Sequence, residues 1–147
     1  MRTTRRYAVI LRPVFFMENL LSPFSLQGDT LATALGSDTG PQMVSVADIG
    51  WFGARAFTDA VSLNGRAIDI AGDVRTMHEA AAILANALGR RIVFAETPIE
   101  QVRQFSKDIA LMLEWFERVG YSADIDGLER EFGVLTKLPE WARQHAH

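Results

Sequence analysis

Apolar and polar positions along this chain follow two different periods, which predict strands separated by helices. Apolar runs of strand length, continuous or alternating, occur at four places: residues 7–11, 42–46, 66–72 and 91–96. Between and after the later runs, apolar residues recur every three or four positions, as they do on one face of a helix. Strands that alternate with helices predict an α/β domain.

The first run, from Tyr7 to Leu11, contains no polar position, so it predicts a strand that is buried on both faces. Pro13 lacks a backbone N–H and is expected to end this strand. A short helix is predicted at residues 17–24, broken at Ser22 and Pro23. Residues 25–41 are rich in Gly, Ser, Thr and Asp, and predict a loop with one short strand.

Two helices in the middle of the chain have recognisable starts. Asp48 is placed to cap the first of them, and the apolar stripe of that helix is predicted to be Ile49, Phe52, Ala56 and Phe57. Thr76 and Glu79 have the spacing of a capping box. The helix that they begin is predicted to run to residue 88 and to stop at Gly89.

The longest helix is predicted after the last strand. Thr97, Pro98 and Glu100 supply an N-cap residue, a proline at the first helical position and an acid in the first turn. The helix is expected to run to about residue 119, with this apolar stripe: Val102, Phe105, Ile109, Leu113 and Phe116. One or two short helices should follow, carrying Leu128, Phe132 and Trp141.

Composition narrows the classes of function. The formal net charge of −3 gives no basic field that would favour nucleic acid or an anionic membrane. The chain has no cysteine, which excludes disulfides, cysteine zinc sites and thiol nucleophiles. No apolar run reaches the roughly 18 residues that a membrane helix needs. We therefore expect a cytoplasmic protein that binds neither nucleic acid nor membrane.

A phosphate-binding loop is the first chemistry to look for in an α/β domain. Such a loop needs closely spaced glycines between a strand and a helix, so that backbone N–H groups can reach the phosphates. Gly50 and Gly53 are the nearest candidates. Trp51 and Phe52 occupy positions that need small residues, and Asp48 would lie beside the phosphates. We interpret these glycines instead as allowing close packing of a helix.

The sequence also contains no motif that indicates acid–base catalysis or a metal site. A Tyr-x-x-x-Lys pair is absent, because Tyr7 is followed at that spacing by Leu11, and Tyr121 by Ile125. His78 lacks the second histidine of a zinc protease helix. We therefore assign no catalytic residue and no metal ligand.

The segment "RPVFFMEN" is the strongest candidate for a binding surface, because it gathers aromatic, thioether and amide side chains in one turn. It can also be interpreted as part of the core, with Phe15 and Phe16 buried and Asn19 bonded to the backbone of the turn. Trp115 lies one position off the stripe of the longest helix. This position fits either half-burial or the wall of a pocket.

Six segments, taken together and in order, resemble the carboxyl half of the NmrA-like proteins. They are "YAVILRPVFFMENL", "QMVSVADIG", "GRAIDIAGD", "T-x-x-E-A-A-x-I-L-A-x-A-L-G", "WFERVGYSADIDGL" and "LTKLPEWARQH". The NmrA-like proteins are atypical short-chain dehydrogenase/reductases with a Rossmann-type fold. They include NAD(P)H-dependent reductases and NADP-sensing regulators.

The resemblance implies a role for the aromatic turn. In the family this turn follows the sixth strand and approaches the nicotinamide end of NAD or NADP. Carried over to this chain, the cofactor-binding residues are Pro13, Val14, Phe15 and Phe16. The residues that border the substrate are Phe16, Met17, Asn19 and Trp115.

The resemblance also implies that a glycine-rich nucleotide-binding half should come before residue 7, and this sequence contains none. We therefore predict a non-family segment at residues 1–6 and a single domain at residues 7–147. That domain would be the carboxyl-terminal portion of a Rossmann-type fold. NAD or NADP is expected to bind weakly or not at all to this chain alone.

Three functions remain open. The chain is the substrate-binding half of an oxidoreductase that is inactive without a separate nucleotide-binding half, or a non-catalytic regulator that binds a small molecule or a protein, or a fragment with no function of its own. In the first case we expect a small-molecule substrate. We also expect a separate nucleotide-binding chain, or self-association through the strand at residues 7–11, whose edge would be open.

Overall fold

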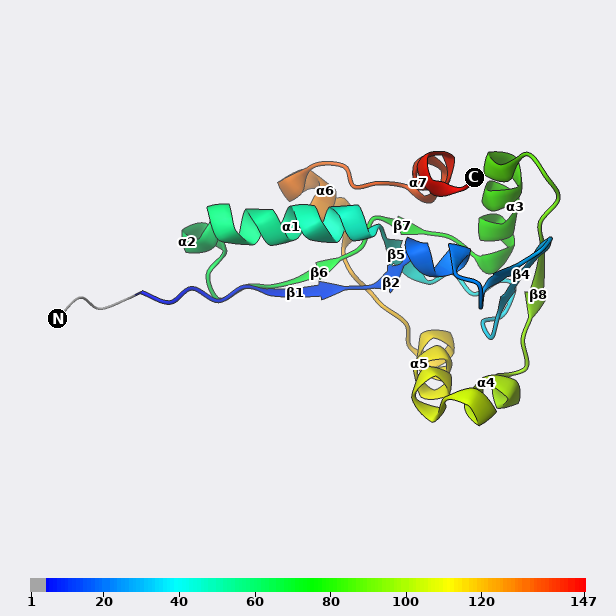
Figure 1. Ribbon diagram of the computed structural model, residues 1–147. Helices are drawn as coiled ribbons and strands as arrows, with labels where there is room; N and C mark the ends of the chain where they lie inside the picture. The colour runs from blue at the N-terminus through cyan, green and yellow to red at the C-terminus, as the bar shows by residue number, and fades with distance from the viewer. Residues whose placement is uncertain (1–4) are drawn as a thin grey trace.

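The computed structural model describes residues 5–147 as an α/β fold with its helices packed around short, mostly parallel strand pairs (Figure 1). The strands are β1 (Ile10–Pro13), β2 (Phe15–Phe16), β3 (Leu26–Gln27), β4 (Thr30–Thr33), β5 (Gln42–Val44), β6 (Ala67–Ile70), β7 (Asp73–Val74) and β8 (Val93–Glu96). The helices are the 3-10 helix η1 (Met17–Leu21), α1 (Val46–Thr58), α2 (Ala60–Leu63), α3 (Met77–Leu88), α4 (Ile99–Phe105), α5 (Lys107–Arg118), α6 (Ile125–Phe132) and α7 (Leu138–His145).

Three small sheets carry the fold. In the first, β1 pairs with β6 in parallel; in the second, β5 lies between β2 and β7; in the third, β4 lies between β3 and β8. Strands β1 and β2 are successive parts of one extended segment, and Val14 N between them donates to Ile70 O at 3.2 Å. The segment therefore joins the first sheet to the second and delivers the aromatic turn between them.

Two apolar clusters hold these sheets in place. One lies under α1 and contains Val14, Phe52 and Ile70. The other lies between η1, α3 and α7 and includes Leu35 and Trp141. Each large apolar side chain that is fully buried contributes roughly 1.5–3 kcal/mol, so the two clusters fix the turn from both sides.

The prediction that residues 7–11 form a strand buried on both faces is wrong. The strand begins only at Ile10, and 60% of the Ile10 side chain is exposed. Successive side chains of a strand point to opposite faces, so Leu11 packs into the cluster under α1 while Ile10 points away from it. Figure 1 shows α1 and α6 above the β1–β6 pair, and no helix of the described chain below it.

The capping of α1 also differs from the prediction. The N-cap is Ser45, whose Oγ accepts from the backbone N–H of Asp48 at 3.1 Å. The Asp48 carboxylate accepts instead from the N–H and the hydroxyl of Thr136, at 2.8 and 3.1 Å, and so ties α1 to the segment before α7. Phe57 is not part of the buried stripe, because 88% of it is exposed.

Gly50 and Gly53 do not serve close packing of α1, so that interpretation is wrong. A Cβ atom added at either position would meet no atom within 4 Å. Residues 25–41 hold two short strands, β3 and β4, where one was expected.

The capping box of α3 is confirmed. Thr76 Oγ1 accepts from the N–H of Glu79 at 3.1 Å, and the Glu79 carboxylate accepts from the N–H of Thr76 at 3.0 Å. The helix ends at Leu88, and Gly89 follows with a φ of 63°, a left-handed conformation that glycine adopts easily.

The predicted longest helix is two helices. Ser106 interrupts it, and its hydroxyl caps α5 by accepting from Ile109 N at 3.3 Å. The first part, α4, begins after Pro98, which is the N-cap residue in place of Thr97. The break turns the last residue of α4, Phe105, outward, so that 76% of this side chain is exposed.

Between residues 5 and 147 no helix has both the length and the apolar character needed to cross a bilayer. The same residues contain no group of three or more His, Asp or Glu side chains placed to hold a metal ion.

Candidate functional site

An apolar cavity of about 480 Å³ lies between η1, β4, α4 and α5. Its most buried lining residues are Leu35, Ala34 and Phe15, and its rim includes the exposed rings of Phe24 and Phe105. Of the described residues, only uncharged ones line it. A concave, mostly apolar space with a few polar groups is the usual form of a small-molecule site.

The aromatic turn forms the inner wall of this cavity. Phe15 pairs with Met43 in the parallel β2–β5 ladder and points inward, whereas the next residue, Phe16, points out. Met17 is fully buried, which directs the opposite side of η1, with Asn19, toward the cavity. Ser22 N donates to Asn19 O at 3.2 Å and closes the turn.

Glu18 holds the turn in place. Its carboxylate accepts from Val46 N, the first residue of α1, at 3.1 Å, and from Trp141 Nε1 of α7 at 3.0 Å. Hydrogen bonds to an ionised acceptor are stronger than those between neutral groups. The turn is therefore fixed to two helices that are distant in the sequence, and the position of Asn19 follows from this.

The outer wall comes from the interruption between α4 and α5. Thr97 N donates to Thr33 O at 2.7 Å, which extends the β4–β8 pairing and places α4 across the cavity. At the mouth, the rings of Phe24 and Phe105 lie 6.1 Å apart between centroids, at an interplanar angle of 40°.

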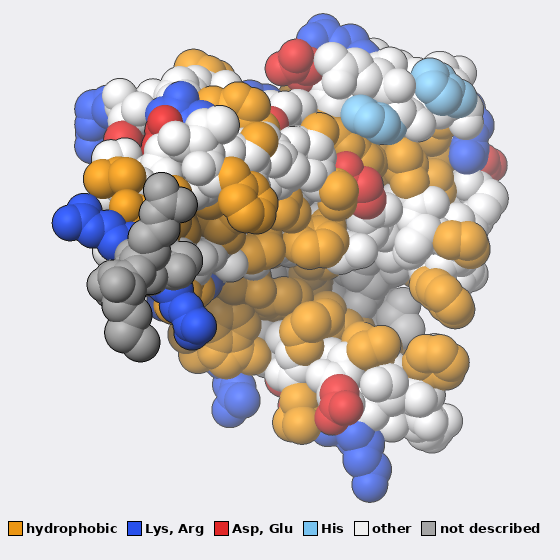
Figure 2. All heavy atoms as spheres, turned by 60° about the vertical axis from the view of Figure 1, so that its left-hand side comes forward, with side chains coloured by type: hydrophobic (Ala, Val, Ile, Leu, Met, Phe, Trp, Pro, Cys, Tyr) orange, Lys and Arg blue, Asp and Glu red, His pale blue; other side chains and the backbone are white. Residues whose placement is uncertain are grey.

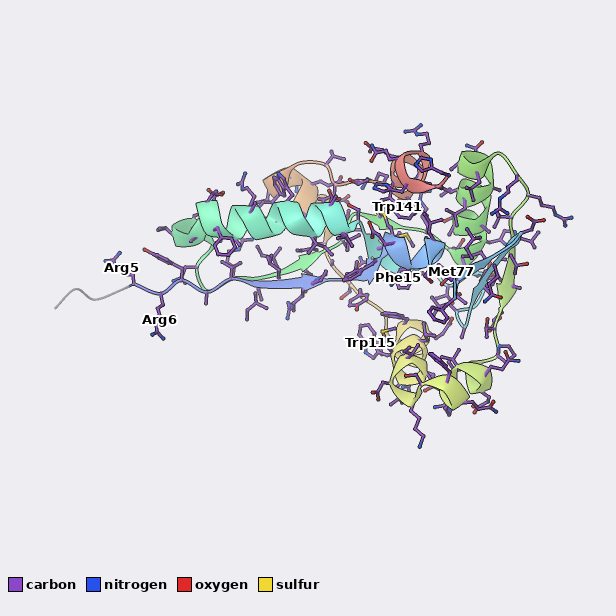
Figure 3. The ribbon with its side chains drawn as sticks, viewed as in Figure 1. Arg5, Arg6, Phe15, Met77, Trp115 and Trp141 are labelled. Carbon is purple, nitrogen blue, oxygen red and sulfur yellow. The ribbon has the colours of Figure 1, made fainter. Side chains whose placement is uncertain are left out.

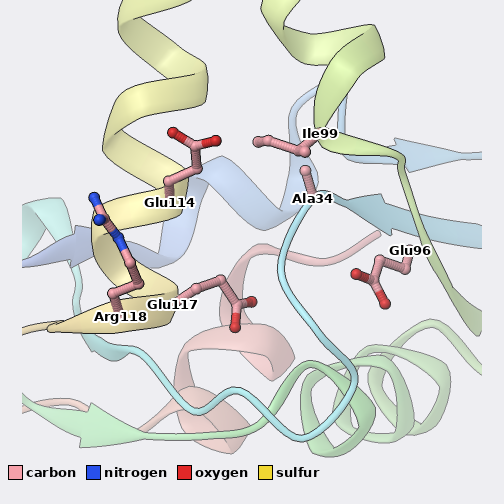
Figure 4. A pocket seen from close by; sticks show the side chains of 6 residues that line it. All are labelled: Ala34, Glu96, Ile99, Glu114, Glu117 and Arg118. Atoms are coloured by element: carbon pink, nitrogen blue, oxygen red, sulfur yellow. The ribbon is translucent and has the colours of Figure 1, made fainter.

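A second cavity, also of about 480 Å³, shares Ala34 with the first but has charged walls. Its lining residues on α5 are Glu114, Glu117 and Arg118, and Figure 4 shows Ala34, Ile99 and Glu96 opposite this helix. Glu117 accepts from the backbone N–H of Gly36 and from the Thr39 hydroxyl.

The other acid on α5 that faces this second cavity is also bonded within the chain. Glu114 forms an ion pair with Arg103. The hydrogen bonds that Arg103 donates to Glu114 and to Glu100 raise the pKa of its guanidinium. We call the first space the apolar cavity and the second the acidic cavity.

The structure separates the residues that the sequence placed at the cofactor and the substrate. Phe15 and Asn19 line the apolar cavity, whereas Val14 and Met17 are buried in the two clusters. Pro13 ends β1 and is half-buried. Contact of these residues with cofactor or substrate stays a prediction.

Phe16 and Trp115 lie outside the apolar cavity, and each is exposed over about a third of its surface. Trp115 packs on Phe116 and Tyr121, and Phe116 meets Phe15 edge to face at 6.1 Å. Burial raises the pKa of the Tyr121 phenol. Figure 3 shows Trp115 at the end of α5 nearest the sheet, below the segment that carries Phe15. The roles of Phe16 and Trp115 remain predictions.

The sequence did not single out Phe24, Gln101 or Phe105 as site residues. Phe105 was assigned to the buried stripe, because the spacing of three or four residues continues through the break. A signal for the break was present: Ser106 followed by Asp108 is the pattern of a helix start.

In each of the longer helices at least one first-turn N–H group is bonded by a side chain of this chain. The accepting side chains are those of Glu18 and Ser45 at α1, Thr76 at α3, Ser106 at α5, Asp124 at α6 and Asp73 at α7. First-turn N–H groups are the groups that bind anions when they are free.

Parallel strand pairs connected through helices define an α/β protein of the Rossmann type. The model of the NmrA-like family matches residues 3–142, so the chain belongs to the NmrA-like family.

Solved structures give the same fold. The chain superposes on an NADPH-dependent quinone oxidoreductase from Escherichia coli with a TM-score of 0.74 and 23% identity, over 92% of this chain and 54% of the other. It superposes on a Citrobacter sp. triphenylmethane reductase complexed with NADP(H) with a TM-score of 0.74 and 18% identity, over 96% and 53%. It also superposes on NmrA, a negative transcriptional regulator in complex with NAD, with a TM-score of 0.69 and 14% identity. This match covers 97% of this chain and 53% of NmrA.

The chain thus spans about half the length of the solved structures that it matches. At these identities the superpositions establish the fold alone. A comparison with curated proteins gave no match.

Proposed function

We propose that residues 7–147 form the substrate-binding half of an NAD(P)H-dependent oxidoreductase of the NmrA-like family. The apolar cavity would hold the substrate, and a nucleotide-binding half from outside these 147 residues would hold the dinucleotide. The observation that carries this proposal is the cavity itself, which opens beside the aromatic turn and has uncharged walls among the described residues.

The N-termini of the helices support the proposal that another polypeptide binds the dinucleotide, because side chains of this chain already occupy N–H groups there. A pyrophosphate is bound by free backbone N–H groups at the start of a helix. The start of α1, the longest described helix, is instead occupied by the carboxylate of Glu18, which would repel a phosphate. We therefore propose that NAD or NADP binds weakly or not at all to this chain alone.

The open face of the β1–β6 pair supports a partner. Figure 2 shows hydrophobic side chains across the middle of a hollowed face, between the α1 side and the α5 side. The exposed apolar residues of the chain include Ile10, Phe16 and Trp115. Covering such residues removes apolar surface from water. We propose that a nucleotide-binding half covers this face, or that two copies associate through β1.

A non-catalytic regulator that binds a small molecule or a protein is the second candidate, and one observation favours it. Reduction by hydride transfer also needs a proton, and no titratable side chain of the described residues lines the apolar cavity. The proton would have to come from the nucleotide-binding half or from solvent. A regulator would not need one.

Titration of the chain with NADPH, followed by tryptophan fluorescence, tests the proposal. We expect no saturable quenching at micromolar NADPH for the chain alone, and quenching with substrate reduction after an NmrA-like nucleotide-binding half is co-produced. Micromolar binding by the chain alone would contradict the proposal that another polypeptide binds the dinucleotide. Binding without reduction in the complex would favour the regulator.

Light scattering tests the proposed partner face separately. The wild-type chain should associate at micromolar concentration or bind the added half, and Ile10→Glu should reduce this association. The control is Val61→Glu, at an exposed position of α2. A wild-type chain that stays monomeric and ignores the added half would contradict the proposal.

A further inference from the structure

We propose that the apolar cavity selects an uncharged, largely apolar molecule with a planar ring, and that Phe24 and Phe105 clasp this ring at the mouth. The inference rests on the proposed function only in taking this cavity as the substrate site. It concerns what the site accepts, so it can fail or succeed independently of hydride transfer.

The walls of the cavity exclude ions. Moving a charged group from water to an apolar environment without a partner costs far more than moving a neutral polar group. The described lining residues offer no such partner. Of the three acids that line the acidic cavity, Glu114 and Glu117 are bonded within the chain to Arg103 and to the Gly36–Thr39 loop. The third, Glu96, is exposed and is not part of the lining of the apolar cavity. An ionic ligand would therefore lose its hydration without compensation.

The polar groups of the lining are neutral and can meet a neutral polar substituent. Asn19 and Gln101 carry amides, each able to donate and to accept. Among the hydrogen bonds of the described residues, none engages either side-chain amide. A carbonyl or hydroxyl group on an otherwise apolar ligand has the matching chemistry.

The volume sets the scale of the ligand. About 480 Å³ falls within the usual range of small-molecule sites, roughly 300–1,000 Å³. This favours a compact molecule of one or a few rings over a peptide or a polymer.

The aromatic pair at the mouth of the apolar cavity indicates that the ligand contains a planar ring. Phe24 and Phe105 are each 76% exposed, although each belongs to the lining of the cavity. Their centroids, 6.1 Å apart, leave the rings in contact with each other. A planar ring held between them would need about 7 Å, since stacked carbon atoms lie about 3.5 Å apart. Two exposed side chains can open by this small amount through rotation alone.

Both residues also lie where the chain can move them. Phe24 follows Pro23 in the turn after η1, and Phe105 is the last residue of α4, directly before the break at Ser106. Neither ring takes part in the two buried clusters. These two rings therefore do not contribute to the packing of the core. Binding of a ligand ring explains why two large apolar side chains are exposed at the mouth.

Calorimetric titration with three probes that share one ring system tests the charge selection. The probes are 2-naphthol, 2-naphthalenesulfonate and 2-naphthylmethylammonium, titrated into the chain at neutral pH. We expect 2-naphthol to bind at least about tenfold more tightly than either ion. Equal or tighter binding of an ion, or no binding of 2-naphthol, would overturn the inference.

Phe105→Ala and Phe24→Ala test the clasp. Each should weaken 2-naphthol binding by about tenfold, and neither should impair folding, because both side chains are exposed. The matched control is Phe57→Ala, at a phenylalanine on α1 that is also largely exposed and is not among the cavity residues. Unchanged affinity in both clasp variants would overturn the role of these rings.

Gln101→Glu tests the electrostatic part with almost no change in shape. The variant should lower the affinity for the sulfonate further and raise that for the ammonium probe by several-fold; unchanged affinities would contradict the selection by charge. If 2-naphthol binds as expected while no reduction occurs in the complex with a nucleotide-binding half, the proposed function fails and the inference stands.

Discussion

The apolar and acidic cavities have the same volume and share a wall at Ala34, but they differ in the partners of their larger polar side chains. In the acidic cavity, Glu117 is bonded to Thr39 and Glu114 to Arg103, so these side chains brace α5 against the rest of the chain. In the apolar cavity, Asn19 and Gln101 stay unengaged within the described chain. Volume alone therefore does not distinguish a brace from a binding site, whereas the partners of the lining groups do.

The difference also explains how the apolar cavity can remain open. Its frame is held from outside: by the hydrogen bonds of Glu18 to α1 and α7, and by the β4–β8 pairing that carries α4. Within the lining, the Ser22 hydroxyl bonds to that of Ser25 and Thr33 Oγ1 accepts from Leu35 N, whereas the amides of Asn19 and Gln101 are left for a ligand.

The largest effect on stability is expected at the inner wall of the apolar cavity. Leu35→Ala should lower the free energy of unfolding by about 2–5 kcal/mol, because it removes buried apolar volume from a packed cluster. Urea denaturation measures this, with Val61→Ala on the exposed side of α2 as the control. A loss below about 1 kcal/mol would mean that the wall is not packed as described.

A smaller effect is expected at the acidic cavity. Glu117→Ala removes the acceptor of Gly36 N and of the Thr39 hydroxyl, and should cost about 1 kcal/mol of stability. The same urea experiment measures it, and 2-naphthol affinity should stay within about twofold of the wild-type value. If Glu117→Ala abolished 2-naphthol binding without unfolding the chain, the two cavities would not be independent.

Replacing Arg103 should have a still smaller effect. Arg103→Gln breaks two ion pairs, with Glu100 and with Glu114, and ion pairs between partly exposed groups contribute little. Its melting temperature should therefore fall less than that of Glu117→Ala, as measured by differential scanning calorimetry. A larger fall would show that Arg103 organises the α4–α5 junction, which would link the acidic cavity to the clasp.

The smallest effect is expected from pH. No titratable side chain of the described residues lines the apolar cavity, so the affinity for 2-naphthol should be constant between about pH 5.5 and 8.5. The pKa values of Arg66, Arg103 and Tyr121 are raised further above this window, and hydrogen bonding to Arg66 lowers the pKa of Glu131 further below it. Calorimetry across the window checks this, and a change beyond about threefold would show that an unassigned ionisable group acts on the ligand.

Local signals predicted local structure well. The start and end of α3 follow from Thr76, Glu79 and Gly89, because each acts within one helical turn. The α4–α5 break was missed, because the apolar spacing runs on through Ser106. The α/β class was predictable, since strand and helix periods differ.

The site itself was predictable only in part. The turn with Phe15 and Asn19 was found, because its composition is unusual. Phe24, Gln101 and Phe105 were not, because they come from segments far apart in sequence that only the β4–β8 pairing and the helix break bring together. The exposure of Ile10 could not be foreseen either: periodicity shows which face of a strand is apolar, but not what covers that face.

Nuclear magnetic resonance of the ¹⁵N-labelled chain, titrated with 2-naphthol, tests most directly whether the apolar cavity is the binding site. The side-chain amide signals of Asn19 and Gln101 should shift in proportion to saturation, while the backbone signals of Thr39 and Glu117 in the acidic cavity stay in place. Shifts at Thr39 and Glu117, with none at Asn19 and Gln101, would contradict the assignment of binding to the apolar cavity.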